Sequence, residues 1–324
     1  MTVSTDRAIP FAIAFEDVVA NVEQVIRGKR AAVELATICL FAQGHLLVED
    51  VPGLGKTTLA RSLAASVNAR CHRIQFTPDL LPADITGTNV FNQRTSEFTF
   101  RPGPVFAGIV IGDEINRASP KTQSALLEVM EERHVTVDGT RYPVPAPFMV
   151  IATQNPVDMD GTYALPEAQL DRFLMRLRIG YPTLDAELEI LEGRQVGRRV
   201  EDLRPVLRAE DVVAHADRTL GVHVAPEMRR YIVRVVAATR SRRDVVRLGA
   251  SPRGSVALLR AAQVRAASTG RSFVTPDDVG VLAGPLLAHR LVLTPEAELR
   301  RVTAEDVVAE VLDTVPSPRR LVAT

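Results

Sequence analysis

The most informative segment of the sequence is Val51-Pro52-Gly53-Leu54-Gly55-Lys56-Thr57-Thr58. It follows the apolar run His45–Val48 and precedes the segment Leu59–Ala64. Glycines permit backbone angles that other residues resist, so the N–H groups of such a turn can converge on an anion at the start of a helix. The helix dipole favours negative charge at the same point. The stretch therefore predicts a phosphate-binding turn between a buried strand and a helix.

The residues of this turn have separate expected roles. We expect Lys56 to reach the β and γ phosphates of a nucleotide and the Thr57 hydroxyl to ligate Mg²⁺. The residues expected to line the nucleotide are Pro52, Gly53, Leu54, Gly55, Lys56, Thr57 and Thr58. The strict pattern has glycine at position 50, where this chain has Asp50. The alternative is a glycine turn that caps a helix and leaves Lys56 in solvent, but it does not explain the buried strand before the turn.

A second predicted apolar strand ends in two acidic residues. Asp113 and Glu114 follow the run Ile109–Gly112, and ligands of open parallel sheets bind beyond the carboxyl ends of the strands. Asp113 is therefore expected to hold Mg²⁺ through its water shell. Glu114 is expected to polarise the water that attacks the γ-phosphate. A solvated acidic pair that caps the next helix is the alternative, which the nearby phosphate turn disfavours.

A third predicted apolar strand, Phe148–Ala152, is followed closely by an asparagine. Asn155 follows it by three residues and is expected to orient the attacking water or to contact the γ-phosphate. The alternative is structural, because Asn155 precedes a proline and Asn-Pro pairs favour turns.

The first half of the chain alternates between helical and strand patterns, which predicts an α/β fold with a parallel sheet covered on both faces. The predicted helices are 15–26, 29–42, 56–68 and 120–132, and the predicted strands are 46–49, 71–76, 108–111 and 148–152. Two further segments, 90–100 and 134–142, predict hairpins, the second with Asp138-Gly139 at its centre.

Beyond Tyr181 nearly every pattern is helical, beginning with 185–194. We therefore predict two domains, a nucleotide-binding α/β domain over residues 1–181 and a helical domain over residues 182–324. A stripe at three- and four-residue steps predicts one buried helix face, formed by Met228, Tyr231, Ile232, Val235, Val236 and Thr239.

Composition narrows the classes of function. Lys and Arg number 39, and so do Asp and Glu, which argues against a protein that mainly coats nucleic acid. Cys39 and Cys71 form no CxxC pair or zinc spacing and are expected to be reduced and buried. With no evident signal peptide and no run of 18 apolar residues, we expect no membrane span and a cytoplasmic protein.

An ordered set of motifs strongly resembles the MoxR family of AAA+ ATPases. The motifs are VPGLGKT, GDEINRASPKTQSALLEVMEE, ATQNP, LPEAQLDRF and ASPR, which together extend over nearly the whole chain. The resemblance implies a P-loop AAA+ core, a small all-helical lid and a homo-oligomeric ring, usually of six subunits. It also implies an inserted hairpin at 90–100 and a second hairpin around Asp138-Gly139, which in such rings tend to face the pore or a partner.

The same resemblance assigns roles to two arginines. Arg172, in Leu170-Asp171-Arg172-Phe173, looks like the arginine finger that reaches the γ-phosphate held by a neighbouring subunit. Arg253, in Ser251-Pro252-Arg253, looks like the lid arginine that senses phosphate. Without the resemblance, both would be interpreted as solvated. A further basic group is interpreted as a solvated face and consists of Arg240, Arg242, Arg243 and Arg247.

The predicted function is hydrolysis of Mg·ATP in a ring that remodels, assembles or activates a client protein. The resemblance implies a chaperone-like role, often with a von Willebrand factor A domain partner. A nucleic-acid motor or loader shares this architecture, but zero net charge and the lack of aromatic stacking runs weigh against it. A small-molecule phosphotransferase would need a second catalytic base, which the sequence does not show. A nucleotide-gated scaffold with little turnover remains the alternative from a different class.

Overall fold

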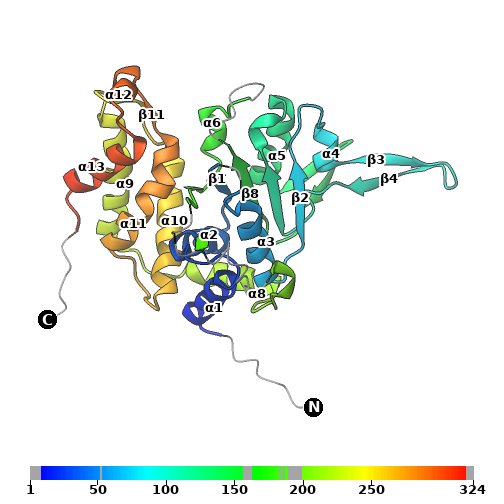
Figure 1. Ribbon diagram of the computed structural model, residues 1–324, viewed down its shortest axis with the longest axis horizontal. Coiled ribbons are helices and arrows are strands. Elements are labelled where there is room, and N and C mark those ends of the chain that lie inside the picture. The colour runs from blue at the N-terminus through cyan, green and yellow to red at the C-terminus, as the bar shows by residue number, and fades with distance from the viewer. Residues whose placement is uncertain are drawn as a thin grey trace, which may run out of the picture.

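Five parallel strands form the central sheet, in the order β2-β5-β8-β1-β9 (Figure 1). Their bounds are Leu46–Glu49 for β1, Cys71–Gln75 for β2, Ile109–Asp113 for β5, Met149–Gln154 for β8 and Met175–Leu177 for β9. The computed structural model describes residues 9–51, 53–155, 163–181, 184, 187, 188 and 199–318. The predicted parallel sheet is confirmed, and each predicted strand matches an observed one within two residues at either end.

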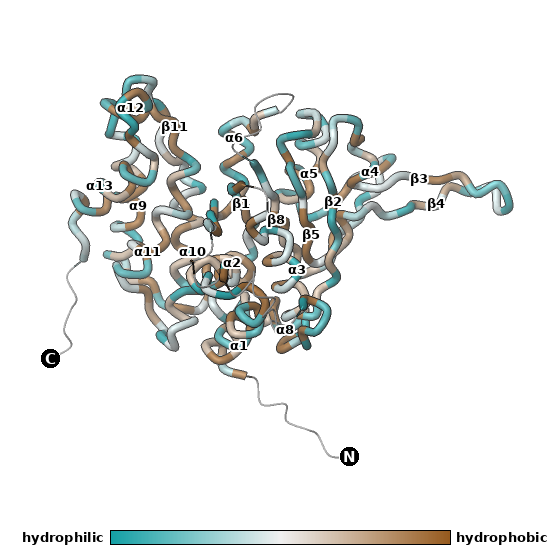
Figure 2. Tube along the Cα trace, in the orientation of Figure 1, coloured by the Kyte–Doolittle hydropathy of each residue, from teal (hydrophilic) through white to brown (hydrophobic). Residues whose placement is uncertain are grey.

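Both faces of the sheet are covered, as the apolar runs in its central strands β1, β5 and β8 predict. Side chains alternate between the faces, so Leu46 and Val48 lie in one apolar core while Leu47 lies in another. The first core includes α1 (Phe11–Glu23), α2 (Arg30–Phe41) and α3 (Lys56–Ser66), and the second includes α5 (Pro120–Glu132). Figure 2 shows the apolar residues gathered along the sheet and the hydrophilic tip of the β3–β4 hairpin.

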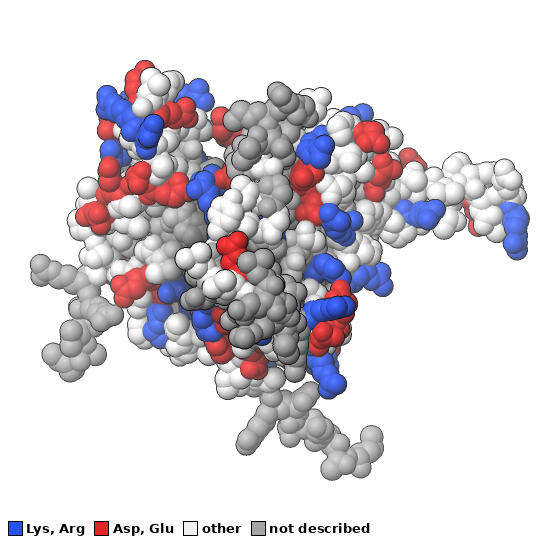
Figure 3. Space-filling model, viewed as in Figure 1, with Lys and Arg blue, Asp and Glu red and all other residues white. Residues whose placement is uncertain are grey.

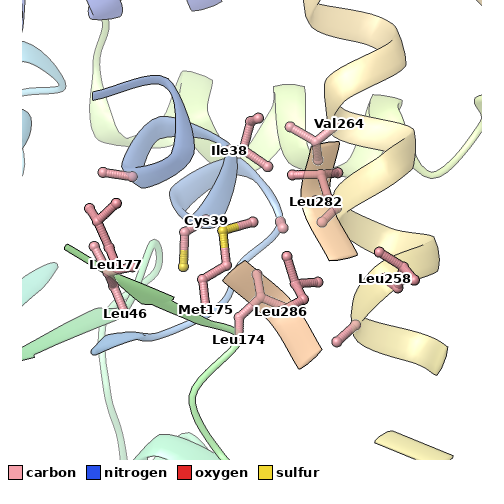
Figure 4. Close-up of a cluster of buried hydrophobic side chains, with 14 of the residues drawn as sticks. Ile38, Cys39, Leu46, Leu174, Met175, Leu177, Leu258, Val264, Leu282 and Leu286 are labelled. Atoms are coloured by element: carbon pink, nitrogen blue, oxygen red, sulfur yellow. The ribbon is translucent and has the colours of Figure 1, made fainter. Parts of the chain in front are cut away.

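The second half of the described chain is mainly helical and packs beside the sheet (Figure 1). Its helices are α8 (Ala209–Thr219), α9 (Pro226–Ser241), α10 (Pro252–Ser268), α11 (Pro276–Leu287), α12 (Pro295–Leu299) and α13 (Ala304–Thr314). Figure 4 shows that one apolar cluster joins the two halves, with Cys39 from α2, Leu46 from β1, Leu258 from α10 and Leu286 from α11. The apolar stripe of α9 is buried as predicted.

Both predicted hairpins are present and are longer than expected at one or both ends. Strands β3 (Gly87–Asn92) and β4 (Glu97–Pro102) form an arm that protrudes from the molecule (Figure 1). Strands β6 (His134–Val137) and β7 (Thr140–Pro143) form the second hairpin. At the base of the arm, a side chain on Gly87 would come within 2.3 Å of the Arg101 carbonyl oxygen. Only glycine therefore fits there, and its φ of +91° is one that glycine adopts without strain.

Several sequence expectations need correction. The first helix begins at Phe11 rather than at residue 15 and ends at Glu23 rather than at residue 26. The second half contains a short antiparallel pair, β10 (Val246–Leu248) with β11 (Val292–Leu293), because the chain crosses there between helices in extended conformation. Cys71 is only half-buried, since it lies on edge strand β2, whereas Cys39 is buried; both are free thiols.

Two expectations stay predictions. Most of the predicted helix 185–194 lies outside the described residues. The division into domains at residue 181 is consistent with the position of the sheet but is not established by it. In the described part of the chain, no helix is long and apolar enough to cross a membrane.

The remaining short elements connect these layers. They are α4 (Pro82–Thr86), α6 (Glu167–Leu170) and the 3₁₀ turns η1 (Ile115–Arg117), η2 (Val200–Asp202) and η3 (Ala288–Arg290).

A buried histidine fixes the start of β1. The Nδ1 atom of His45 accepts the Val150 N–H at 2.9 Å, so its Nε2 atom carries the proton and donates to the Met130 carbonyl at 3.0 Å. Both ring nitrogens are satisfied only in the neutral form. Burial, together with the positive charge of Arg133, lowers the pKa of His45 to about 3.

This lowered pKa predicts acid-sensitive folding. The unfolded chain takes up a proton at His45 as the pH falls below about 6.5, whereas the folded chain resists protonation until about pH 3, so stability is complete above pH 6.5 and falls between these values. His45→Asn should reduce the slope of the free energy of unfolding against pH, which is at most about 1.4 kcal/mol per pH unit for one proton. Urea unfolding between pH 7.5 and 5 measures the slope. The same substitution at the exposed His223 is the control, and an equal slope in both variants would contradict the prediction.

Candidate active site

The sheet order brings the predicted nucleotide residues to one edge. Strand β1 leads into the glycine turn, its neighbour β8 leads into Asn155, and the next strand, β5, ends at Asp113. Glu49 is level with Gln154, and Gln75 of β2 is level with Asp113. Because all of these strands are parallel, their carboxyl ends meet at this edge, where ligands of open α/β sheets bind.

The glycine turn has the backbone that the sequence predicts. Gly53 and Gly55 have φ of +86° and +81°, and α3 begins at Lys56 directly after Gly55. The ammonium group of Lys56 donates to the carbonyls of Asp50 and, at 3.4 Å, of Gln154, so it lies across the turn. Pro52 lies outside the described residues. This arrangement offers main-chain N–H groups and a lysine to an anion at the start of a helix.

Thr57 and Asp113 lie close together beneath the turn. The Thr57 hydroxyl is 3.3 Å and 3.4 Å from the two carboxylate oxygens of Asp113. Asp113 is buried and also accepts hydrogen bonds from the Thr153 hydroxyl, at 3.2 Å, and from Arg73 Nε, at 2.5 Å. A hydroxyl and a carboxylate are oxygen ligands of the kind that Mg²⁺ takes, so the residues present fit this cation.

Glu114 is held in an unusual backbone conformation. Its φ is +56°, a region that residues other than glycine rarely adopt. Its N–H donates to the Thr153 hydroxyl at 3.0 Å, which stabilises the turn of the chain. Its Oε2 atom accepts from Gln75 Nε2 at 2.9 Å and from Arg117 Nη1 at 3.0 Å. Both described hydrogen bonds of the carboxylate go to Oε2, so Oε1 stays available to a water.

Asn155 directly follows β8 and is buried. Strand β8 lies between β5 and β1 in the sheet. Asn155 therefore lies at the same edge as Asp113 and the turn. The structure brings together Lys56, Thr57, Asp113, Glu114 and Asn155, as expected from their positions after strands.

Asp50 explains the departure from the strict motif. Its Oδ2 atom accepts the N–H groups of Ile179 and Gly180, each at 2.7 Å. These residues follow β9 and begin the connection toward the helical half. Glycine could not make either contact, so Asp50 fastens the phosphate turn to this connection.

Arg172 and Arg253 lie elsewhere. Leu174 donates its N–H to the carbonyl of His45, and Met175 is level with Leu46, so Arg172 lies at the amino end of β1 while the glycine turn follows its carboxyl end. The four residues of β1 separate these ends by about 10 Å. Arg172 and Arg253 both form ion pairs with Glu131, which places Arg253 at the same end. The structure brings these arginines to each other and not to Lys56 of their own chain.

The lid is fastened to the sheet beside these arginines. Arg290 is buried and donates from Nε to Asp171 Oδ1 at 2.7 Å, and also to the carbonyls of Asp171, Phe173, Leu174 and Leu286. Ser251 donates its hydroxyl to Asp171 Oδ2 at 2.9 Å. One aspartate therefore holds two segments of the helical half.

Comparisons with known proteins agree with this geometry. Residues 45–175 match the family model described as "ATPase family associated with various cellular activities (AAA)", and residues 237–311 match the one described as "AAA lid domain". Chaperone MoxR1 of Mycobacterium tuberculosis is 41% identical, over 94% of this chain and 82% of its own. The chain belongs to the MoxR family of AAA+ ATPases. Its activity is accordingly ATP hydrolysis, and its fold is the P-loop AAA+ core with a helical lid.

Further relatives match over most of the chain. YeaC of Bacillus subtilis is 49% identical over 93% of both chains, and Protein MoxR of Methylorubrum extorquens is 30% identical over 92% of this chain and 93% of its own. A crystal structure from Cytophaga hutchinsonii superposes with a TM-score of 0.89 at 35% identity, over 96% of this chain and 97% of that one.

The sequence did not reveal the residues that position the predicted site residues through hydrogen bonds and ion pairs. Arg73 and Gln75 lie two residues apart at the end of β2, so both side chains lie on the same face of the sheet. This spacing of polar residues at the carboxyl end of a strand could have indicated their role. Glu131, Asp171 and Arg290 carry no local signal, because their partners lie 41 to 122 residues away in the chain. The basic group is only partly solvated, since Arg242 pairs with Asp244 and Glu310 and Arg240 donates to the Ala250 carbonyl.

Loss of the Asp50 carboxylate should destabilise the chain. Asp50→Ala leaves two main-chain N–H groups without their charged acceptor and is expected to lower the free energy of unfolding by about 2–4 kcal/mol. Asp50→Asn keeps one side-chain oxygen and is expected to lose less. Guanidinium chloride unfolding compares the two variants, and unchanged stability of Asp50→Ala would show that these contacts are not formed in solution.

Proposed function

We propose that the chain hydrolyses Mg·ATP at sites shared between neighbouring copies of a ring of six subunits. The observation that carries this proposal is that Arg172 lies at the opposite end of β1 from the glycine turn. A finger that is about 10 Å or more from its own turn can complete a site only on another copy. This geometry supports the role in trans that the resemblance implies.

The residues at the carboxyl edge divide the chemistry among them. Main-chain groups of the turn and Lys56 bind the phosphates, with Thr57 and Asp113 as the residues that would hold Mg²⁺. When bound, Mg²⁺ neutralises charge on the β and γ phosphates. Glu114 orients and polarises the attacking water through Oε1, the oxygen that Gln75 and Arg117 leave available. Asn155 orients the water or contacts the γ-phosphate from the adjacent strand.

Phosphoryl transfer depends mainly on positioning and on stabilisation of charge. Arg172 supplies that charge from the neighbouring copy. Arg253 lies with Arg172 at Glu131, so we assign it to the neighbour's nucleotide as well. The two ends of one sheet thus have complementary roles, one binding nucleotide and the other completing the next site.

The ring is proposed to act on a client protein in the cytoplasm, with a von Willebrand factor A domain protein as a partner. The name of the relative Chaperone MoxR1 supports the chaperone-like role. The protruding β3–β4 arm offers a contact surface, since Val90, Phe91 and Phe98 are exposed on it. Charges of both signs are interspersed over the face seen in Figure 3, which gives no support to a nucleic-acid motor.

A shared site predicts that activity depends on concentration. Phosphate release per subunit should rise with protein concentration as copies associate and then reach a plateau. The measurement is a dilution series of the ATPase rate paired with size-exclusion chromatography. Measurable activity of a species that elutes as a monomer would contradict the shared site, and Arg172→Ala should remove the activity at every concentration.

Replacing the predicted base should separate turnover from binding. Glu114→Gln keeps the shape of the side chain but cannot take a proton, so hydrolysis is expected to fall by about 10²-fold or more. Affinity for ATP, measured with a fluorescent nucleotide, should stay near that of the unchanged protein because Glu114 lies outside the glycine turn. Undiminished client activation by this variant would favour the scaffold with little turnover.

A further inference from the structure

One carboxylate joins the two arginines that complete the site. Glu131, near the end of α5, forms an ion pair with Arg172, whose Nη2 lies 3.1 Å from Oε2, and accepts a hydrogen bond from Arg253 Nη2 through Oε1. The three side chains come from three separate segments, since Arg172 lies in the turn before β9 and Arg253 lies in the first turn of α10. We propose that Glu131 is a positioning residue that holds Arg172 and Arg253 side by side as a double-arginine group. This inference rests on the proposed function, in which both act on the neighbour's γ-phosphate.

Electrostatics explains why a carboxylate is needed between them. Two guanidinium groups repel each other, and the attraction of both to a carboxylate between them offsets this repulsion. Glu131 removes one of the two positive charges and leaves a net charge of +1 for the phosphate. A guanidinium has five N–H donors, and within the described residues each of these side chains gives Glu131 one nitrogen and bonds to nothing else. The remaining donors stay available to phosphate oxygens.

The main chains beside both arginines are already fixed. Asp171, directly before Arg172, accepts from Ser251, two residues before Arg253, and from the buried Arg290. The principal freedom left to the two arginines is therefore the rotation of their long side chains. Glu131 removes this freedom at the tips, where a shift of 1 Å is enough to slow a reaction substantially.

Stability of the fold gives no equivalent reason for Glu131. The last turn of a helix favours positive charge, so Glu131 and Glu132 at the end of α5 both oppose the helix dipole. The Glu131 side chain is 35% exposed, and surface ion pairs contribute little to stability. Glu132 shares the position and the charge, but in the described structure its carboxylate pairs with neither arginine. Glu132 therefore provides the matched control.

Complementation between two inactive variants tests the inference. Lys56→Ala cannot bind ATP productively but supplies both arginines, and Arg172→Ala binds ATP but supplies no finger. Equimolar mixtures should regain ATPase activity at sites formed between them. Adding Glu131→Gln to the Lys56→Ala supplier should lower that activity by about 10- to 100-fold, mainly in kcat and with little change in KM. A supplier with Glu131→Asp instead should keep part of the activity. A supplier with Glu132→Gln instead should keep the full activity of the original mixture.

Placement of the substitution separates positioning from folding. Glu131→Gln added to the Arg172→Ala subunit, which hydrolyses ATP, should change the activity much less than in the supplier. Equal loss in both placements, no loss in the supplier, or a gain of activity would each overturn the inference. Failure of the original Lys56→Ala and Arg172→Ala mixture to regain activity would instead overturn the shared site, and the inference with it.

Discussion

The buried guanidinium of Arg290 fixes the relation between the sheet and the lid. A buried charge is tolerated only when its donors are paired, and Arg290 meets this condition with Asp171 and four carbonyl groups. Three of those carbonyls belong to the chain that leads into β9, and the fourth belongs to α11. The interaction thus holds the lid against the segment that carries Arg172. Burial lowers the pKa of Arg290, whereas the charge of Asp171 raises it, which is the balance expected of a paired interior ion.

This attachment has a functional consequence because the sheet is parallel. Its carboxyl edge carries the glycine turn, Asp113 and Glu114, and its amino edge lies beside Arg172 and the lid. A parallel sheet collects the ends of its strands in this way whatever its sequence. Arg253 belongs to the lid, so the packing of the lid places it at the amino edge beside Arg172. In the proposed function, each edge therefore carries one half of a site, and association of copies would join the two halves.

The sequence predicts the central strands β1, β5 and β8 well because strands buried on both faces are continuous apolar runs. Strand β9 was not predicted, because it has only three residues and the middle one is arginine. The sequence also predicts the catalytic candidates at the carboxyl edge, since each of them comes at the end of such a run or shortly after it. Arg73 and Gln75 at the same edge were missed, because β2 is not a continuous apolar run. The amino edge is different. Glu131, Asp171 and Arg290 come from separate helices and turns, and charged residues on helices are ordinarily solvated. Only packing of the lid brings them together, so no local pattern could have identified them. Arg172 and Arg253 were found through family resemblance, not through periodicity.

Local sequence rules are broken at two positions of the carboxyl edge, and both serve the site. Asp50 replaces a glycine and joins the turn to the connection after β9. Glu114 adopts a left-handed backbone, which costs a residue other than glycine about 1–3 kcal/mol. Thr153 offsets this strain with one hydroxyl that accepts the Glu114 N–H and donates to Asp113. The same hydroxyl therefore holds the main chain at Glu114 and the carboxylate of Asp113, so the strain at Glu114 and the position of Asp113 are set together. A side chain without a hydroxyl at position 153 would remove one hydrogen bond from the Glu114 main chain and one from the Asp113 carboxylate, which makes Thr153 a supporting part of the site.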